Sequence, residues 1–147
     1  MDFETAVKLN IYETIAETTR IPSASAVARA LDSSVAAVEE AFQRLGAQRL
    51  LVLEPGGAAG IRMAPPFSAI ETPFLVRVVG RGYYANCVWD AYGVSAALHR
   101  DARIVSSDGL TGEPLELMVQ GGKPLPRPYV GHFAVPAAHW WDDIVAT

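Results

Sequence analysis

Hydrophobic residues recur at helical spacing in three segments near the start of the chain, and serines precede the second and third of them. An apolar stripe at this spacing, preceded by a capping serine, is typical of an amphipathic helix. Gly46 is expected to end the third helix, because glycine readily adopts the left-handed conformation of a C-terminal cap. The predicted helices cover residues 3–18, residues 26–31 with Ser23 or Ser25 as the cap, and a segment from Ser33 or Ser34 to about Leu45.

Strand-like runs follow the third helix. Residues 48–53 are apolar and predict a strand, residues 54–57 predict a turn, and residues 61–63 predict a weaker partner strand. Three helices followed by a hairpin are the plan of a winged helix, and residues 23–45 have the rhythm of a helix-turn-helix.

A pair of prolines, Pro65-Pro66, marks the expected boundary between two lobes, residues 1–66 and residues 67–147. In the second lobe the pattern predicts mixed β-strands around a central helix from Cys87 to Leu98, and a short terminal helix that starts at Pro136. The predicted strands of this lobe are residues 74–79, 102–106, 115–119 and 129–135. The chain as a whole is predicted to be an α+β protein with a winged-helix-like first lobe.

Charge argues against a nucleic-acid partner for that first lobe. Residues 1–66 carry six basic and eight acidic side chains, and the third helix, which would enter a groove, has Glu39 and Glu40 against Arg44. Phosphate contacts supply most non-specific affinity for DNA, so an acidic recognition helix is unfavourable. The formal net charge of -4 and the pI near 5.3 also argue against a nucleic-acid partner.

The remaining composition indicates an ordinary cytoplasmic domain. One cysteine excludes an internal disulfide framework and suits a reducing compartment. The first residues lack a basic region followed by an apolar run, so no signal peptide is expected, and no apolar stretch has the length needed to cross a membrane. The oligomeric state is left open.

The clearest chemical signal is the single cysteine. Asn86 is a good N-cap, which would place Cys87 in the first helical turn, where unpaired N–H groups and the helix dipole favour a thiolate. Asp90 lies one turn further and would face the sulfur, either to take its proton or to hold a cation. The alternative is an inert, buried cysteine that packs as a small hydrophobe.

Three other residues are candidates for a substrate pocket. The rings of Tyr84 and Trp89 would pack in the core or wall a pocket for an apolar group. His132 would be a locally hydrogen-bonded strand residue or a ligand.

Read in order, the motifs of the second lobe resemble those of the alkylmercury lyases, the bacterial enzymes that cleave organomercurials. Tyr84-Ala-Asn-Cys87-Val-Trp-Asp90 resembles the aromatic lead-in to that family's Cys-x-x-Asp. Three later segments, which are similar to the family's strand motifs and to its His-Phe and Val-Pro run, are residues 97–107, residues 111–119 and residues 132–136.

The resemblance implies protonolysis of a carbon–mercury bond. Cys87 would be the thiolate nucleophile and mercury ligand, and Asp90 would carry the proton to the leaving carbon and share in binding the metal. No resident cofactor is implied, since Hg(II) enters with a small-molecule substrate. In the family a second cysteine, just before the His-Phe pair, completes the ligand set, whereas this chain has Pro126-Arg-Pro-Tyr-Val-Gly131 there.

The missing thiol leaves the activity open. With one cysteine, the chemistry would need an exogenous thiol or His132 as the other ligand. The resemblance, weighed against the missing thiol, favours an alkylmercury-lyase-like enzyme. The alternatives are a diverged enzyme that uses the same pair on another small electrophile, and a non-catalytic protein that binds or senses a soft metal.

Overall fold

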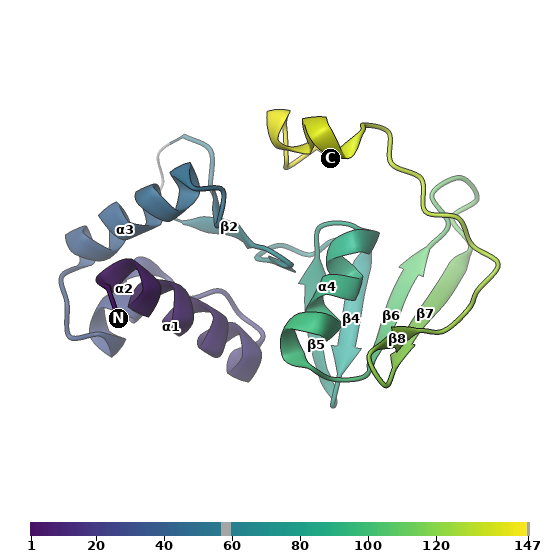
Figure 1. Ribbon diagram of the computed structural model, residues 1–147, viewed down its shortest axis with the longest axis horizontal. Helices are drawn as coiled ribbons and strands as arrows, with labels where there is room; N and C mark the ends of the chain where they lie inside the picture. Colours follow the sequence, from purple (N-terminus) through teal and green to yellow (C-terminus); the bar gives the residue numbers. More distant parts are fainter. Residues whose placement is uncertain (57–59, 147) are drawn as a thin grey trace. The chain divides into compact units, whose positions relative to one another are not determined.

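The computed structural model describes residues 1–56 and 60–146 (Figure 1). The chain divides into two compact units, Met1–Glu71 and Thr72–Thr147. Pro65-Pro66, where the sequence pattern places a boundary, forms the turn between strands β2 and β3 within the first unit. The α+β class predicted from the sequence is confirmed, with three helices first and antiparallel strands with one long helix after them.

The first unit begins with helices α1 (Phe3–Thr18), α2 (Ala24–Ala30) and α3 (Val35–Ala47). The side chains of Ser23 and Ser34 accept hydrogen bonds from backbone N–H groups one turn on. Of the serines predicted as possible caps, Ser23 therefore caps α2 and Ser34 caps α3. The apolar stripes meet in one core that buries Val7, Ile11, Ile15, Val27, Val38, Phe42 and Leu45.

Gly46 lies inside α3 and does not end it, contrary to the expectation from the sequence. Arg49 adopts the left-handed conformation instead, with φ of 60°, and the Leu50 N–H bonds to the carbonyl of Leu45. A Cβ on Gly46 would lie 3.3 Å from the Leu53 side chain, so the glycine serves close packing against the following strand.

Strands β1 (Val52–Leu53), β2 (Ile61–Ala64) and β3 (Phe67–Ser68) complete this unit as antiparallel neighbours. Only the last two residues of the predicted strand 48–53 are in β1, because the preceding residues close the end of α3. The predicted turn at residues 54–57 ends in Gly57, which lies outside the described residues.

The second unit is an antiparallel sheet with one helix on it (Figure 1). Helix α4 (Val88–Leu98) connects β5 to β6 and packs on β4, which lies between those two strands. Where mixed strands were expected, every described pair is antiparallel. The strands run in the order β5 (Arg81–Ala85), β4 (Phe74–Val78), β6 (Ala102–Ser107), β7 (Pro114–Gln120) and β8 (Lys123–Pro124).

Buried residues from the sheet and the helix form the core of this unit. Val76, Tyr83 and Ile104 lie on the face that α4 covers, and Ala91 and Val94 of the helix are fully buried. Alternation along the strands places these side chains on one face. The core therefore fixes the helix on the sheet, and with it the residues at the start of α4.

Tyr83 and Tyr84 belong to strand β5, because β4 supplies backbone partners. One expectation for this unit is wrong. Residues 129–135 form no strand, since the two-residue β8 is the last element that pairs with the sheet. The terminal helix is present as a 3₁₀ helix, η1 (Ala137–Asp142), directly after Pro136.

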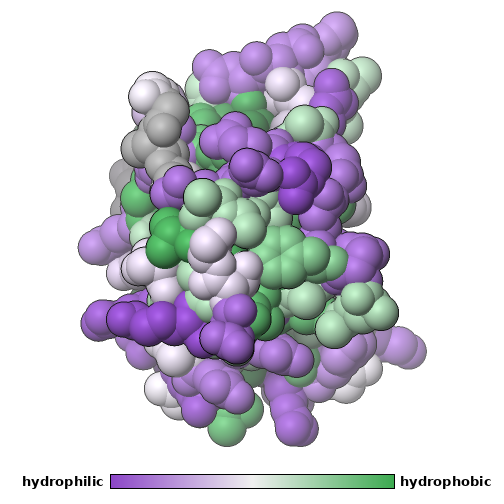
Figure 2. All heavy atoms as spheres, turned by 90° about the vertical axis from the view of Figure 1, so that its left-hand side faces the viewer, coloured by the Kyte–Doolittle hydropathy of each residue, from purple (hydrophilic) through white to green (hydrophobic). Residues whose placement is uncertain are grey.

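Within the described residues, no helix is long and apolar enough to cross a membrane. Figure 2 shows one face of the molecule, on which hydrophobic residues gather in the middle and polar residues surround them.

Candidate active site at the start of helix α4

Cys87 lies at the junction between strand β5 and helix α4. It is the N-cap residue of α4, with extended backbone (φ −146°, ψ 178°), and its carbonyl accepts the first helical hydrogen bond from the Ala91 N–H at 2.9 Å. The sequence predicts Asn86 as the cap, and the N-cap is one residue later. Asn86 therefore lies just before the cap. Its side-chain Nδ2 donates to the carbonyl oxygen of Ile144 at 3.3 Å.

The Cys87 thiol faces the Asp90 carboxylate. Cys87 Sγ lies 3.7 Å from Asp90 Oδ2, which is within hydrogen-bonding distance for sulfur, and both side chains are half-buried. The single turn between the N-cap and the third helical residue brings the two groups together. The spacing read from the sequence thus corresponds to a real contact.

The pKa of the Cys87 thiol is raised, which corrects the expectation of a low-pKa thiolate. Burial is the largest cause, and the negative charge of Asp90 acts in the same direction. The backbone N–H groups of Asp90 and Trp89 lower the pKa, as a helix start should, but burial and the carboxylate outweigh them. The free protein therefore holds Cys87 as a thiol at neutral pH.

The pKa of Asp90 is raised as well. Burial is again the main cause, and the hydrogen bond from the Cys87 thiol lowers the pKa without cancelling that effect. A carboxyl group whose neutral form is favoured is suited to accept and return a proton. The two groups together can deprotonate the sulfur when an electrophile arrives and keep the proton nearby.

The other predicted site residues do not all lie beside this pair. Trp89 is the second residue of α4 and is 67 % exposed, so its ring stands at the surface. Tyr84 pairs with Leu75 and alternates with the buried Tyr83, so it lies on the sheet face that α4 does not cover. His132 is exposed in the irregular segment after β8.

The same segment returns to the start of α4. A Cβ placed on Gly131 would lie 4.0 Å from Val88 Cγ1, which is ordinary contact distance. Further on, the Ile144 carbonyl accepts the hydrogen bond from Asn86. Residues on both sides of Cys87 are therefore contacted by the C-terminal segment. These contacts were not predicted from the sequence, in which the only signal is the glycine in a Pro-rich loop.

A metal ion would find few protein ligands here. Among the described residues there is no group of three or more His, Cys, Asp or Glu side chains that could hold a metal. Cys87 and Asp90 offer one sulfur and one carboxylate. An incoming soft metal would have to bring part of its own ligand set.

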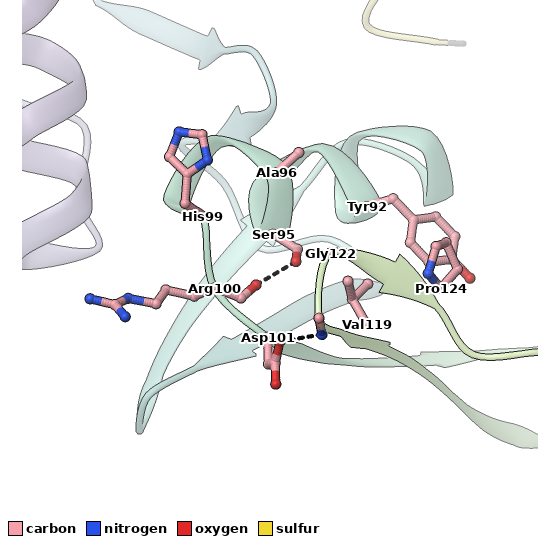
Figure 3. Close-up of a pocket in the computed structure, with 10 residues that line it drawn as sticks. Tyr92, Ser95, Ala96, His99, Arg100, Asp101, Val119, Gly122 and Pro124 are labelled. Atoms are coloured by element: carbon pink, nitrogen blue, oxygen red, sulfur yellow. Dashed lines mark hydrogen bonds between the residues drawn. The ribbon is translucent and has the colours of Figure 1, made fainter.

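The second unit also has an open cavity of about 530 Å³ at the other end of α4 (Figure 3). Tyr92, Ser95 and Val119 line it, and neither Cys87 nor Asp90 does. The Ser95 hydroxyl is already occupied, since it donates to the carbonyl of Arg100 at 2.5 Å, and the Arg100 side chain points away (Figure 3). This cavity is separate from the thiol and carboxyl pair.

Comparison with known proteins agrees with the motifs and the fold. The chain shares 24 % identity and a TM-score of 0.66 with a protein described as the mercury-bound form of MerB2, over 86 % of this chain and 60 % of that one. This chain thus spans three fifths of that relative's length. No curated protein matches the sequence.

The family match covers the unit that carries the site. The model of the alkylmercury lyase family, MerB, matches residues 67–147, which is more than half of the chain and includes Cys87 and Asp90. The full sequence has no second cysteine. The chain therefore belongs to the alkylmercury lyase family, as a member with a single thiol.

Proposed function

We propose that the protein is an alkylmercury-lyase-like enzyme that cleaves a carbon–mercury bond by protonolysis. Cys87 is the nucleophile and mercury ligand, and Asp90 carries the proton. The observation that supports this proposal most directly is the 3.7 Å contact between Cys87 Sγ and Asp90 Oδ2 at the start of α4, in a member of this family.

The reaction balances with these two groups alone. The Cys87 thiol passes its proton to Asp90, and the thiolate forms a sulfur–mercury bond with an organomercury cation. Asp90 then delivers that proton to the carbon atom as the carbon–mercury bond breaks. The products are a hydrocarbon and Hg(II) on Cys87. Neither an oxidant nor a resident cofactor is needed.

The raised pKa values fit this order of events. The proton that the carbon needs is present in the free protein, because burial and Asp90 keep Cys87 protonated. Binding of mercury to sulfur replaces that proton. The raised pKa of Asp90 lets the carboxyl group hold the proton until the carbon accepts it.

The second mercury ligand has to come from outside the pair. An exogenous small thiol is the best match, because sulfur suits a soft metal better than the imidazole of His132. The exposed ring of Trp89, two residues after Cys87, offers an apolar surface for the organic group of a small-molecule substrate.

The test is to incubate the protein with an organomercurial and excess small thiol, and to measure the hydrocarbon released. We expect release above a thiol-only control, and its loss in Cys87→Ser and in Asp90→Ala. Glu113→Gln is the matched control, since it neutralises an exposed carboxylate at the β6–β7 turn and should not change release. Release no faster than with thiol alone would refute the proposal.

The single thiol favours one second candidate, a soft-metal binding protein without turnover. Stoichiometric Hg(II) binding that depends on Cys87, with no hydrocarbon released, would support it. A diverged enzyme that uses the pair on another electrophile predicts alkylation of Cys87 by that electrophile and no dependence on mercury.

A further inference from the structure

The residues after β8 form a segment with its own internal contacts, which we call the C-terminal strap (residues 129–146). The rings of Phe133 and Trp140 pack with centroids 5.0 Å apart, and Trp140 Nε1 donates to the Val135 carbonyl at 2.8 Å. The strap contributes no strand to the sheet within the described residues. Its shape is therefore held by side chains and not by sheet pairing.

The strap meets the start of α4 at two points, one on each side of the reactive sulfur. Gly131 lies within side-chain reach of Val88, and the Ile144 carbonyl accepts a hydrogen bond from Asn86 Nδ2 at 3.3 Å. Asn86 and Val88 are the two sequence neighbours of Cys87. Any movement of the strap at these points changes what surrounds the thiol.

The hydrogen bond from Asn86 Nδ2 to the Ile144 carbonyl is a polar link between the strap and this junction. Asn86 is half-buried, and its side chain is not used to cap α4. The N-cap of α4 is Cys87, so the Asn86 side chain lies one residue before the position at which an asparagine caps a helix. Here its amide is turned to the strap, which indicates that holding the strap is its role.

We propose that the C-terminal strap controls access to Cys87 Sγ and that Asn86 is the positioning residue that holds the strap in place. The inference rests on and deepens the proposed function, because a strap that controls access to the thiol would limit the size of the group that can arrive there. It does not depend on turnover, since access to a thiol is measured without any mercury compound.

The test compares alkylation of Cys87 by a small reagent, iodoacetamide, and by a bulky maleimide in the full-length protein. In Asn86→Ala we expect the rate with the bulky reagent to rise about fivefold, the effect of losing one hydrogen bond on an opening equilibrium. The rate with iodoacetamide should rise less. Asn86→Gln, which keeps the amide, should restore part of the wild-type ratio of the two rates.

A second variant addresses the same contact from the strap. Asp143 Oδ1 accepts a hydrogen bond from the Ala146 N–H and so stabilises the turn that presents the Ile144 carbonyl. Asp143→Ala is an exposed change that leaves the core intact, and it should raise the bulky-reagent rate in the same direction. The proposal predicts that Asp143 acts on the thiol through the Asn86–Ile144 contact, so the double variant should be no faster than Asn86→Ala.

Leu110→Ala is the distant control, as Leu110 is 95 % exposed in the β6–β7 turn, and it should leave both rates unchanged. Circular dichroism confirms that each variant is folded. Unchanged rates in a folded Asn86→Ala, or in Asp143→Ala if the first variant does not fold, would overturn the proposal. The proposal would also be overturned if the bulky-reagent rate of the double variant rose by the product of the two single-variant increases. Failure to release hydrocarbon would refute the proposed enzyme and leave this result standing.

Discussion

At the scale of the residue, Cys87 and Asp90 form one hydrogen-bonded pair. Each group is half-buried, each pKa is raised chiefly by burial, and the thiol is within hydrogen-bonding distance of the carboxylate. The helix start lowers the pKa of the sulfur, but two N–H groups do not outweigh burial next to an acid.

The variant Asp90→Asn separates the influence of the carboxylate on the pKa of Cys87 from its proposed role as proton carrier. Removing the carboxylate removes one cause that raises the pKa of Cys87, so we expect the thiolate to appear at lower pH in the variant than in the wild type. The ultraviolet absorbance of the thiolate against pH measures this. Release of hydrocarbon should nevertheless be lost, because no group carries the proton. A thiolate titration that does not move would show that the carboxylate has no influence on the sulfur.

Gly131→Cys is expected to restore a second thiol beside Cys87. A Cβ on Gly131 meets nothing closer than 3.9 Å, so the side chain fits. Two thiolates bind Hg(II) together, and the gain from a second linked ligand is on the order of 10²-fold in affinity. Competition with a small dithiol measures it. Leu125→Cys, a partly exposed position earlier in the same chain segment, is the control. Equal affinities in the two variants would contradict the expected geometry.

At the scale of the element, the β4–β5 hairpin positions the junction that carries the site. Val78 pairs with Arg81, so Val79 and Gly80 are a two-residue turn, and both have positive φ, 46° and 76°. Such turns favour Asn-Gly, because a β-branched residue is strained in the left-handed region. The turn therefore lies at Val79-Gly80, and Gly82 is inside β5.

Val79→Asn should stabilise the protein by about 1 kcal/mol, the cost of a left-handed conformation for an ordinary side chain. Val79 is 82 % exposed, so little buried apolar surface is lost. Urea unfolding measures the change in the free energy of unfolding. Val130→Asn is the control for removing an exposed valine, as it is 93 % exposed and has no positive φ. An equal gain in both variants would rule out turn strain as the cause.

At the scale of the whole molecule, the chain consists of two compact units, and the match to the family model begins at residue 67, close to the start of the second. All the proposed chemistry lies in that second unit, on a helix fixed by the fully buried Ala91 and Val94. A partly buried acid on such a helix is a cost to folding, because it must be desolvated in its charged form.

The stability of the protein should reflect that cost. A carboxyl whose folded pKa lies above its unfolded value contributes most at low pH, and that contribution is lost as pH rises through the folded pKa. At neutral pH, Asp90→Asn is therefore expected to melt at a higher temperature than the wild type, and the difference should shrink as pH falls below the folded pKa. Thermal unfolding across this range measures it. A lower melting temperature of Asp90→Asn at neutral pH would show that the folded protein favours the charged form of Asp90.

The sequence by itself determined the three helices, the family and the Cys87–Asp90 contact. These depend on local periodicity, on motif order and on the fixed rise of one helical turn, which act over short stretches of chain. Only the tertiary structure decided what surrounds the pair. Burial that raises the pKa of Cys87, the turn of Asn86 toward Ile144 and the placement of Tyr84 on the far face all depend on segments distant in sequence. Local pattern cannot encode them, because desolvation and partner choice are properties of the packed chain.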